Sequence, residues 1–463
     1  MRRVAVVGGG LAGITTALRL ADAGCAVVLL EGRPKLGGLT HSFERDGRWI
    51  DNGQHVFLRC CTSYLGLLDR LGVRDQVHLQ PRLDVPVRSG VHPGVGRIRR
   101  NGMPAPLHLG PALATYRWLS VGERVAAVRG ALAMGRVDRT AAETDAQSFG
   151  GWLAAHGQDA RAVEALWELI GIATLNARAD DASLAVAATV FQVGLLEKSD
   201  AADIGWSLAP LQQLHGEAAA HALTAAGVGV RLRARVRGIE AVDGGWTIEG
   251  ERYDDVVLAV PPAEAAGLLP DGAVDLPAGW AEALGSSPIV NAHVVFDRMV
   301  LDEPFVAGVD SPLQWVFDRT VQSGGGDRDE QYIAVSLSAA DELIDTPVAE
   351  LRDVLVPALR QLLPAAADAH VKEFFVTRER QATFRPAPGS GRFRPGATTA
   401  LPGLHLAGAW TATGWPATME GAVRSGEAAA ASVLHAPAAL PSSAPSPSAA
   451  PSASALSSKD VVS

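Results

Sequence analysis

Three glycines near the start of the chain constrain the fold more than any other feature. They have the spacing G-x-G-x-x-G and are Gly8, Gly10 and Gly13. An apolar run at 2–7 precedes them, a helical pattern at 14–23 follows, and a second apolar run lies at 26–30. Buried parallel strands are short and apolar on both faces. The pattern therefore predicts a strand, a helix and a parallel strand, with the glycines in the first turn.

Such a turn is suited to the pyrophosphate of a dinucleotide. The first glycine permits the tight turn, the second lets a phosphate approach the backbone, and the third lets helix and strand pack closely. Leu11 and Ala12 lie in the turn just before the predicted helix, whose free N–H groups and positive dipole end attract anions. Glu31 ends the second strand, where a carboxylate can accept hydrogen bonds from ribose hydroxyls. We predict a dinucleotide site; a plain turn without a ligand is the alternative.

Composition limits the class of protein. A chain of 463 residues with 48% hydrophobic and 20% charged residues can bury the cores of two domains. A net charge of −9 argues against nucleic acid as a partner. Three cysteines form no disulfide framework and suit a reducing compartment. The chain contains no uninterrupted apolar run of about twenty residues. We expect a cytoplasmic protein, either soluble or peripheral at the inner face of the cell membrane.

The residues after Glu31 extend the predicted site. Gly37 and Gly38 allow a close backbone approach to a ligand, and a glycine pair behind the ribose acid favours a long flavin dinucleotide. Gly32 and Arg33 lie between Glu31 and this glycine pair. Arg33 either contacts a phosphate or the ribose edge, or it is solvated in a surface turn. A flavin cofactor is the prediction that accounts for both features.

A polar loop at 51–55, Asp-Asn-Gly-Gln-His, follows a predicted hairpin at 43–50. Polar groups around a glycine, between apolar strands, suggest a loop at a site. His55 is the candidate proton donor, because histidine has an unperturbed pKa near neutrality. A structural histidine is an equally good interpretation. No cluster of residues predicts a metal site.

The middle of the chain is mainly helical. The runs at 107–134 and 149–196 are apolar enough to line a substrate cavity, although core packing explains them equally well. Five arginines lie between 82 and 100, and they form either a solvated edge or a contact with anionic lipid headgroups. Strands are predicted at 227–232, 235–240, 246–248, 253–260, 291–296 and 333–337, with a helix at 348–363.

A second strand, glycine loop and helix close the ordered part of the chain. The strand at 404–410 contains Gly408, and a helix is predicted to run to 434. The N-terminus of that helix can stabilise a negatively charged ring. From residue 436 onward the chain is almost entirely Ala, Pro and Ser, which predicts disorder.

Together these segments resemble the FAD-dependent amine oxidase and phytoene desaturase superfamily. The resemblance rests on 4–13, Glu31, the Gly37-Gly38 pair, 256–262 and 404–422. It implies an α/β fold in which a Rossmann-like FAD-binding domain is interleaved with an α+β substrate domain, as in amine oxidases and glutathione reductase. The implied FAD-binding domain comprises 1–85, 205–270 and 396–434, the substrate domain 86–204 and 271–395, and the tail 435–463. The implied FAD contacts are Gly8, Gly10, Leu11, Ala12, Gly13, Glu31, Gly32, Arg33, Gly37, Gly38, Val236, Gly408, Ala409, Ala417, Thr418 and Met419.

Within that superfamily the chain is most similar to the hydroxysqualene dehydroxylases of hopanoid pathways. Segments 51–55, 380–384 and 413–426 carry this closer resemblance. It implies reductive loss of a hydroxyl from a long apolar isoprenoid, with other squalene and hopanoid enzymes as partners. A carotenoid-type desaturase is the alternative of the same fold, and a flavin-binding scaffold without turnover is the alternative of another class. An amine oxidase fits less well, because the predicted cavity segments suggest no aromatic cage.

One residue departs from the family pattern. The superfamily usually has an aspartate directly after the glycine of the late strand, and Ala409 occupies that position. Loss of a charge-assisted hydrogen bond costs about 1.5–3 kcal/mol. We therefore expect either weaker FAD binding or a replacement contact from a neighbouring residue.

Overall fold

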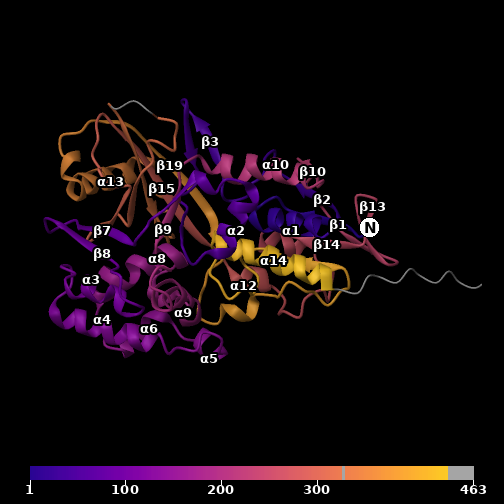
Figure 1. The fold of residues 1–463 in the computed structure, drawn as a ribbon, viewed down its shortest axis with the longest axis horizontal. Helices are drawn as coiled ribbons and strands as arrows, with labels where there is room; N and C mark the ends of the chain where they lie inside the picture. Colours follow the sequence, from indigo (N-terminus) through magenta and orange to yellow (C-terminus); the bar gives the residue numbers. More distant parts are fainter. Residues whose placement is uncertain (326–328, 436–463) are drawn as a thin grey trace, which may run out of the picture.

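The structure is a computed structural model that describes residues 1–325 and 329–435; the predicted disordered tail from residue 436 lies outside it. One end of the molecule is built on a five-stranded sheet (Figure 1). All four strand pairs of this sheet are parallel, which confirms the α/β fold. Its strands in spatial order are β10 (Gly229–Leu232), β2 (Ala26–Glu31), β1 (Arg3–Val7), β14 (Asp255–Leu258) and β20 (Leu404–Leu406).

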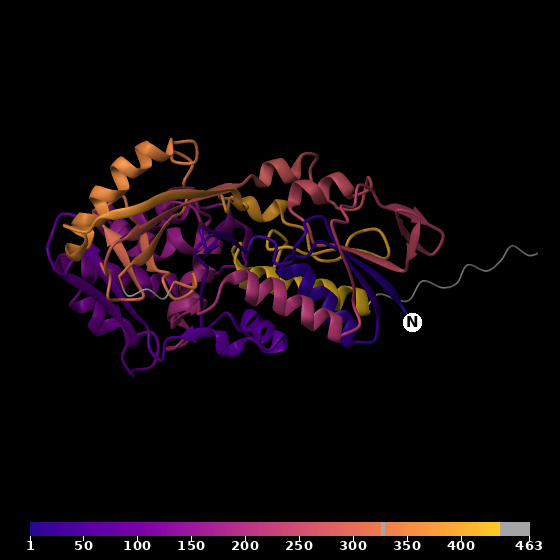
Figure 2. The ribbon, with the colours of Figure 1, turned by 90° about the horizontal axis from the view of Figure 1, so that it is seen from above.

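Both faces of the five-stranded sheet are covered, as its apolar strands require. Val4 and Val6 pack beneath helices α1 (Leu11–Asp22), α10 (Ala218–Ala225) and α14 (Met419–His435). Ala5 and Val7 face the opposite cluster, which includes Trp246 and Tyr253 of a small antiparallel sheet. That sheet consists of β11 (Glu240–Val242), β12 (Gly245–Ile248) and β13 (Glu251–Tyr253). Figure 2 shows α1 in indigo and α14 in yellow side by side.

A seven-stranded sheet forms the other end of the molecule. Only its β16–β7 pair is parallel. Helix α13 (Val348–Leu362) covers one face, and a helical layer packs against the other. The strands are β19 (Val371–Thr383), β15 (Ser287–Phe296), β18 (Gln331–Leu337), β17 (Trp315–Asp318), β16 (Phe305–Val309), β7 (Asp84–Ser89) and β8 (Val95–Arg99). The helical layer contains α3 (Gly110–Ala114), α4 (Val121–Met134), α5 (Ala142–Asp145), α6 (Phe149–Ala155), α7 (Ala160–Ala162), α8 (Glu168–Leu175) and α9 (Leu184–Phe191).

Short elements connect the two ends. The hairpin β3 (Ser42–Arg45) and β4 (Arg48–Asp51) has Asp46-Gly47 at its turn, as predicted, and Asp46 has φ 50°. Strands β5 (Val56–Leu58), β9 (Ile204–Ser207) and β6 (Val77–Leu79) form a further antiparallel sheet. The remaining helices are α2 (Thr62–Leu71), α11 (Pro262–Leu268) and α12 (Trp280–Leu284).

The strand predicted at 235–240 is wrong. β10 ends at Leu232 opposite Glu31, and Arg233 then has φ 57°. The Ala234 N–H bonds to the Glu31 carbonyl at 2.9 Å, so the chain bends around the end of β2 and leaves the sheet. Val236 lies in this irregular run and is half-buried against the cluster below the sheet.

The described residues contain no helix that is both long and apolar enough to span a bilayer.

Candidate cofactor-binding and active site

The residues predicted to bind FAD converge on one edge of the five-stranded sheet. Val7 is paired with both Leu30 and Leu258, and Leu258 with Leu406. Because the strands are parallel, the residues that follow β1, β2, β14 and β20 leave at the same edge. Ligands of open parallel sheets bind outside this carboxyl edge.

Backbone contacts explain the glycines of the first turn. Gly8 has φ 111°, and an added Cβ would lie 2.3 Å from the Ala259 carbonyl oxygen. A Cβ on Gly13 would lie 1.9 Å from the Gly8 carbonyl oxygen. Gly10 precedes α1 without a side-chain cap, so Leu11 and Ala12 begin a helix whose N-terminus is left for a ligand.

The second glycine pair packs directly on the first turn. The Gly37 N–H donates to the Gly9 carbonyl at 2.9 Å. Gly38 has φ 59°, and a Cβ on it would lie 2.8 Å from Cα of Gly10. Two glycine loops from separate parts of the chain thus meet through backbone alone, because no side chain would fit between them.

Glu31 is buried and already holds the turn together. Its Oε2 accepts from the Gly9 N–H at 2.6 Å, and its Oε1 accepts from the Arg33 N–H at 2.7 Å. Each carboxylate oxygen has a second lone pair, so a ribose hydroxyl can still donate to it. Gly32 and Arg33 are exposed beside it, with Cβ of Arg235 3.5 Å from the Cβ position of Gly32.

An arginine that the sequence does not single out organises the loop after β20. Arg394 is buried and donates to the carbonyls of Ala409 at 3.3 Å, Thr411 at 2.6 Å and Trp415 at 2.8 Å. Its guanidinium also lies 4.6 Å from the ring centre of Phe384. Burial lowers the pKa of Arg394 to about 10, which leaves it charged at neutral pH. The Arg394 cation is therefore fixed next to Ala409, the position at which the family usually has an aspartate.

The other predicted residues of the late segment surround the start of α14. Gly408 has φ 144° and donates its N–H to Ser425 Oγ at 2.8 Å. Thr418 caps α14 by accepting from the Gly421 N–H at 3.2 Å. Ala417 and Met419, on either side of Thr418, pack into the two clusters that cover the sheet.

A buried ion pair fixes the polar loop at 51–55. Arg319 Nη2 lies 2.5 Å from Asp51 Oδ2, and both side chains are buried. Asp51 Oδ1 accepts from Ser42 Oγ at 2.6 Å and from the Leu211 N–H at 3.1 Å. Asp51 is thus a structural member of the loop, and it joins the end of β4 to the residue after β17 and to the helical segment that leads into α10.

His55 lies in this loop, with His41 and His215 as titratable neighbours. Burial lowers the pKa of His55 to about 4, against the opposing effect of Asp51. Burial likewise lowers the pKa of His41, and it lowers that of His215 to about 3. At neutral pH all three rings are uncharged. His55 is therefore available as a hydrogen-bonding group, and the pKa opposes a resident imidazolium.

Several buried amide groups near this loop have no hydrogen-bond partner. They are both amide atoms of Gln54, Oε1 of Gln212 and Oδ1 of Asn291. The Asn291 amide lies beside the loop, with Nδ2 3.4 Å from the Asn52 carbonyl oxygen. Buried polar atoms are nearly always paired, so these amides fit a polar ligand ring. The glycine-rich turn with its uncapped helix N-terminus and the unpaired amides near the 51–55 loop suit a flavin dinucleotide.

A row of aromatic side chains begins on β9, which pairs with the strand that follows His55. Val56 is paired with Trp206 in the β5–β9 ladder. The Trp206 and Phe305 ring centres are 5.6 Å apart, those of Phe305 and Trp315 5.8 Å, and those of Trp315 and Phe317 6.1 Å. Trp206 and Trp315 are partly accessible. The sequence does not reveal this row because its members are widely separated along the chain.

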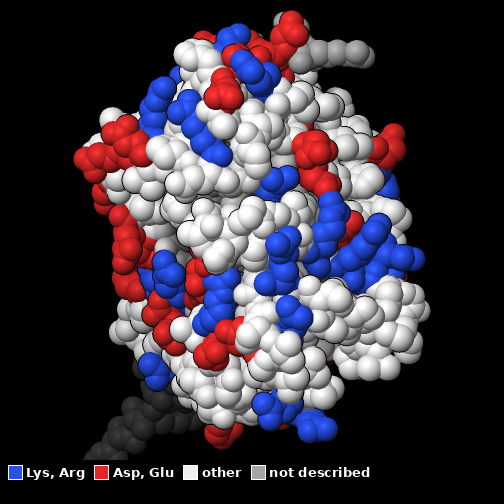
Figure 3. All heavy atoms as spheres, turned by 90° about the vertical axis from the view of Figure 1, so that its left-hand side faces the viewer, with Lys and Arg blue, Asp and Glu red and all other residues white. Residues whose placement is uncertain are grey.

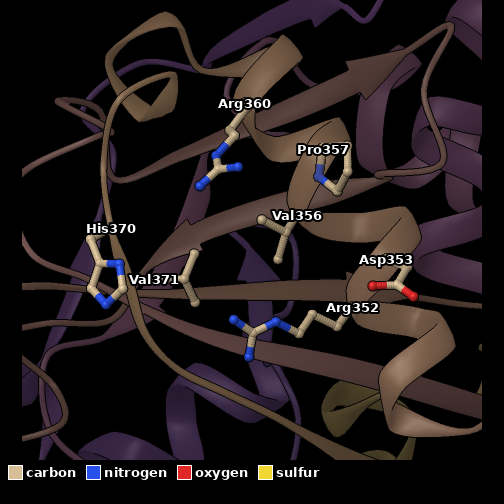
Figure 4. Close-up of a pocket in the computed structure, with 7 residues that line it drawn as sticks. All are labelled: Arg352, Asp353, Val356, Pro357, Arg360, His370 and Val371. Carbon is tan, nitrogen blue, oxygen red and sulfur yellow. The ribbon is translucent and has the colours of Figure 1, made fainter.

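A hollow of about 280 Å³ lies elsewhere, between α13 and the start of β19 (Figure 4). Arg352, Arg360 and His370 surround it, and Figure 1 places α13 far from the sheet edge. We assign this hollow no part in the site. No group of three or more potential metal ligands occurs among residues 1–325 and 329–435.

These features define a dinucleotide-binding oxidoreductase whose cofactor edge adjoins an apolar, aromatic region. The chain matches the flavin containing amine oxidoreductase family over residues 11–434 and belongs to that family. FAD is its cofactor, and the uncapped N-terminus of α1 and the unpaired amides fit that molecule.

The chain is similar to curated proteins of two activities and to a solved structure. A hydroxysqualene dehydroxylase of Rhodopseudomonas palustris is 28% identical over 451 residues, which cover 94% of this chain and 99% of that protein. A zeta-carotene desaturase of Synechocystis is 25% identical, covering 93% and 97%. A solved putrescine oxidase has the same fold, with a TM-score of 0.70, 22% identity and coverage of 94% and 99%.

Proposed function

We propose that the protein is a hydroxysqualene dehydroxylase that converts hydroxysqualene to squalene. The observation that carries this proposal is the aromatic row, which starts at Trp206, opposite the residue after His55, and packs against the apolar helical layer. A long hydrocarbon needs an apolar path of this kind. Relatives of this name match nearly the whole chain at 28% identity.

The reaction replaces a C–OH bond by a C–H bond and is therefore a net reduction. It consumes one hydride and one proton, which the departing hydroxide takes from solvent, and releases one water. Reduced FAD, when bound, supplies the hydride. In this proposal the glycine turn at 8–13 and the N-terminus of α1 hold the phosphates, and Glu31 holds the ribose.

His55 is proposed to bind the departing hydroxyl. Its neutral ring can donate an N–H to that oxygen without carrying a charge. Nearby, Asp51 is committed to Arg319 and Ser42 and has a structural role. The low pKa of His55 makes this hydrogen-bonding role more suitable than transfer of a proton from a resident imidazolium.

The aromatic row is proposed to stabilise the carbon that loses the hydroxyl. Positive charge develops on an allylic carbon as the C–O bond lengthens. The face of a tryptophan attracts a desolvated cation by about 2 kcal/mol. Trp206 and Trp315 are the accessible members of the row.

A carotenoid-type desaturase is the second candidate, because desaturases match this chain at 25% identity over 93% of its length. A desaturase removes hydrogen and forms a double bond, so the two reactions have opposite electron demands. A flavin-binding scaffold would perform neither. Other enzymes of squalene and hopanoid synthesis are the partners that the proposal implies.

Product analysis tests the proposal. The purified protein is incubated with hydroxysqualene and a flavin reductant, and with phytoene and an electron acceptor. The proposal predicts squalene, with a mass lower by one oxygen, and no change in phytoene. A new double bond in phytoene without squalene formation would support the desaturase, and no product from either substrate would support the scaffold.

A further inference from the structure

Helix α4 has an apolar face that no described part of the chain covers. Val121, Val125, Val128 and Leu132 recur at helical spacing and lie on one face. Their exposed fractions are between 43% and 73%. On the opposite face Ala127 and Met134 are buried against the helical layer. Surface helices normally present polar residues to water, so a helix that is apolar on both faces is built to meet a second apolar phase.

The apolar surface continues beyond the C-terminal end of α4. A hollow of about 290 Å³ there is lined by Leu132 from α4, by Pro106 and by Leu196, with Arg136, Gln192 and Glu197 also at its wall. Leu107, next to Pro106, has an exposed fraction of 58%. Residues from two separate segments thus extend the stripe. We call Val121, Val125, Val128, Leu132 and Leu107 the α4 surface.

The segment that carries the α4 surface is basic, although the chain has a net charge of −9. Between residues 101 and 137 there are four arginines and one acid, Glu123, which is tied into the capping box of α4 with Ser120. Arg117, Arg129 and Arg136 are exposed, and no carboxylate of the described residues forms an ion pair with them. Figure 3, which faces this end of the molecule, shows Lys and Arg across its middle among uncharged surface, with Asp and Glu gathered mainly along its left side.

We propose that the α4 surface docks the protein on an anionic lipid bilayer. Aliphatic side chains enter the boundary between headgroups and acyl chains, while arginines around them attract lipid phosphates. A protein partner is a poorer match, because binding hot spots favour tryptophan and tyrosine and the α4 surface contains neither. The docking surface does not depend on which reaction the enzyme catalyses.

Vesicle flotation of the full-length, FAD-loaded protein tests the proposal. The vesicles contain phosphatidylcholine alone or phosphatidylcholine with phosphatidylglycerol. We expect flotation with the anionic vesicles, and a loss of flotation as salt is raised. The combined variant Val121→Gln, Val125→Gln, Val128→Gln and Leu132→Gln should reduce the vesicle-bound fraction at least about tenfold, because most of the inserted area is gone.

Matched controls separate the surface from general stickiness. Val321→Gln with Val354→Gln removes exposed valines outside the α4 surface, and flotation should stay as in the parent. Arg129→Gln with Arg136→Gln should weaken binding to anionic vesicles, whereas Arg237→Gln with Arg392→Gln should not. All variants should keep their FAD content and melting temperature, which shows that they fold.

Two kinds of result would overturn the proposal, a failed flotation test and a dimer. One is a parent protein that floats with neither vesicle, or a glutamine variant that floats as well as the parent. The other is a concentration-dependent dimer in sedimentation that the glutamine variant abolishes, without vesicle binding. The α4 surface would then be an interface between two copies of the chain.

Discussion

Glu31 links the sequence motif to the structure at the scale of a single residue. The motif predicts a ribose contact, and the structure adds that the same carboxylate accepts the N–H groups of Gly9 and Arg33. One side chain thus shapes the turn and is also predicted to hold the ribose. Its two tasks can be separated by the choice of substitution.

We expect Glu31→Ala to lower FAD affinity by about tenfold to a hundredfold, because a charge-assisted hydrogen bond contributes about 1.5–3 kcal/mol. Glu31→Gln should have an affinity between those of the alanine variant and the parent, since its amide oxygen still accepts one of the backbone N–H groups. Titration of apoprotein with FAD measures both. Parent-like affinity in Glu31→Ala would show that Glu31 does not contact the cofactor.

Substitutions of His55 can separate the loss of its ring from the loss of its N–H donor. If its neutral ring donates to the departing hydroxyl, His55→Ala should slow the chemical step about a hundredfold. His55→Gln keeps an N–H donor and should lose less than about tenfold. FAD content should stay unchanged in both variants. Rapid mixing of reduced protein with substrate gives the rate, and an alanine variant within about threefold of the parent would exclude the role.

The sequence reveals residues whose role is set by local spacing, and it does not reveal residues whose role depends on contacts distant in the chain. The glycines and Glu31 are predictable because their spacing is set by one turn and one strand. Arg394 is not, since its partners are carbonyl groups of a loop 15 to 21 positions away. The same holds for the pairing of Asp51 with Arg319, whose side chains meet across 268 positions.

At the scale of elements, α1 and α14 show how two distant helices share one site. A Cβ on Gly426 would lie 2.4 Å from the Ala12 carbonyl oxygen, so the helices touch through backbone. The sequence predicts both helices by their apolar pattern. It does not predict their contact, because a glycine inside a helix is compatible with many different packing arrangements.

Gly426→Ala should therefore destabilise the protein by about 1–3 kcal/mol, as overpacking does in a tight contact. Gly66→Ala in α2 is the matched control, since nothing lies within 4 Å of the added Cβ and alanine favours a helix. Gly66→Ala should raise stability by about 0.5–1 kcal/mol. Urea unfolding compares the two, and equal effects would contradict the close contact of α1 with α14.

The end of β10 shows the limit of pattern at this scale. Residues 235–240 have strand-like composition, yet the backbone of Ala234 bonds to Glu31 and turns away. The competing bond comes from the end of a strand about two hundred positions earlier, where no local pattern can indicate it.

At the scale of the whole molecule, buried neutral histidines make stability depend on pH. Burial lowers the pKa of His293 and His215 to about 3 and that of His55 to about 4, from an ordinary 6.5. At a pH between the lowered pKa of each folded histidine and its ordinary 6.5, the unfolded chain binds protons that the folded chain does not. The free energy of unfolding should therefore rise with pH up to about 6.5 and receive no further gain from these groups above it.

Thermal melting between pH 4 and 7.5 measures this trend, as melting temperature should fall on acidification. His293→Gln should flatten the dependence, because His293 is fully buried between Tyr332 and Thr377. A protein that melts higher at pH 4.5 than at pH 7 would contradict the neutral histidines.

The first part of the five-stranded parallel sheet was predictable, because β1, α1 and β2 alternate along the chain. How the chain passes between its two sheets depends on contacts such as the parallel β16–β7 pair, whose strands are over two hundred positions apart. The aromatic row likewise exists only after β9 and β16 are brought together. The proposed substrate path therefore rests on contacts that local pattern does not reveal.

The central claim is that bound reduced FAD and hydroxysqualene react in this protein. Anaerobic mixing of the reduced protein with hydroxysqualene tests it directly, with the flavin absorbance followed in time and the product identified by mass. The account predicts that the spectrum of oxidised flavin returns and that one squalene forms per flavin. Flavin that stays reduced, with no squalene, would contradict it.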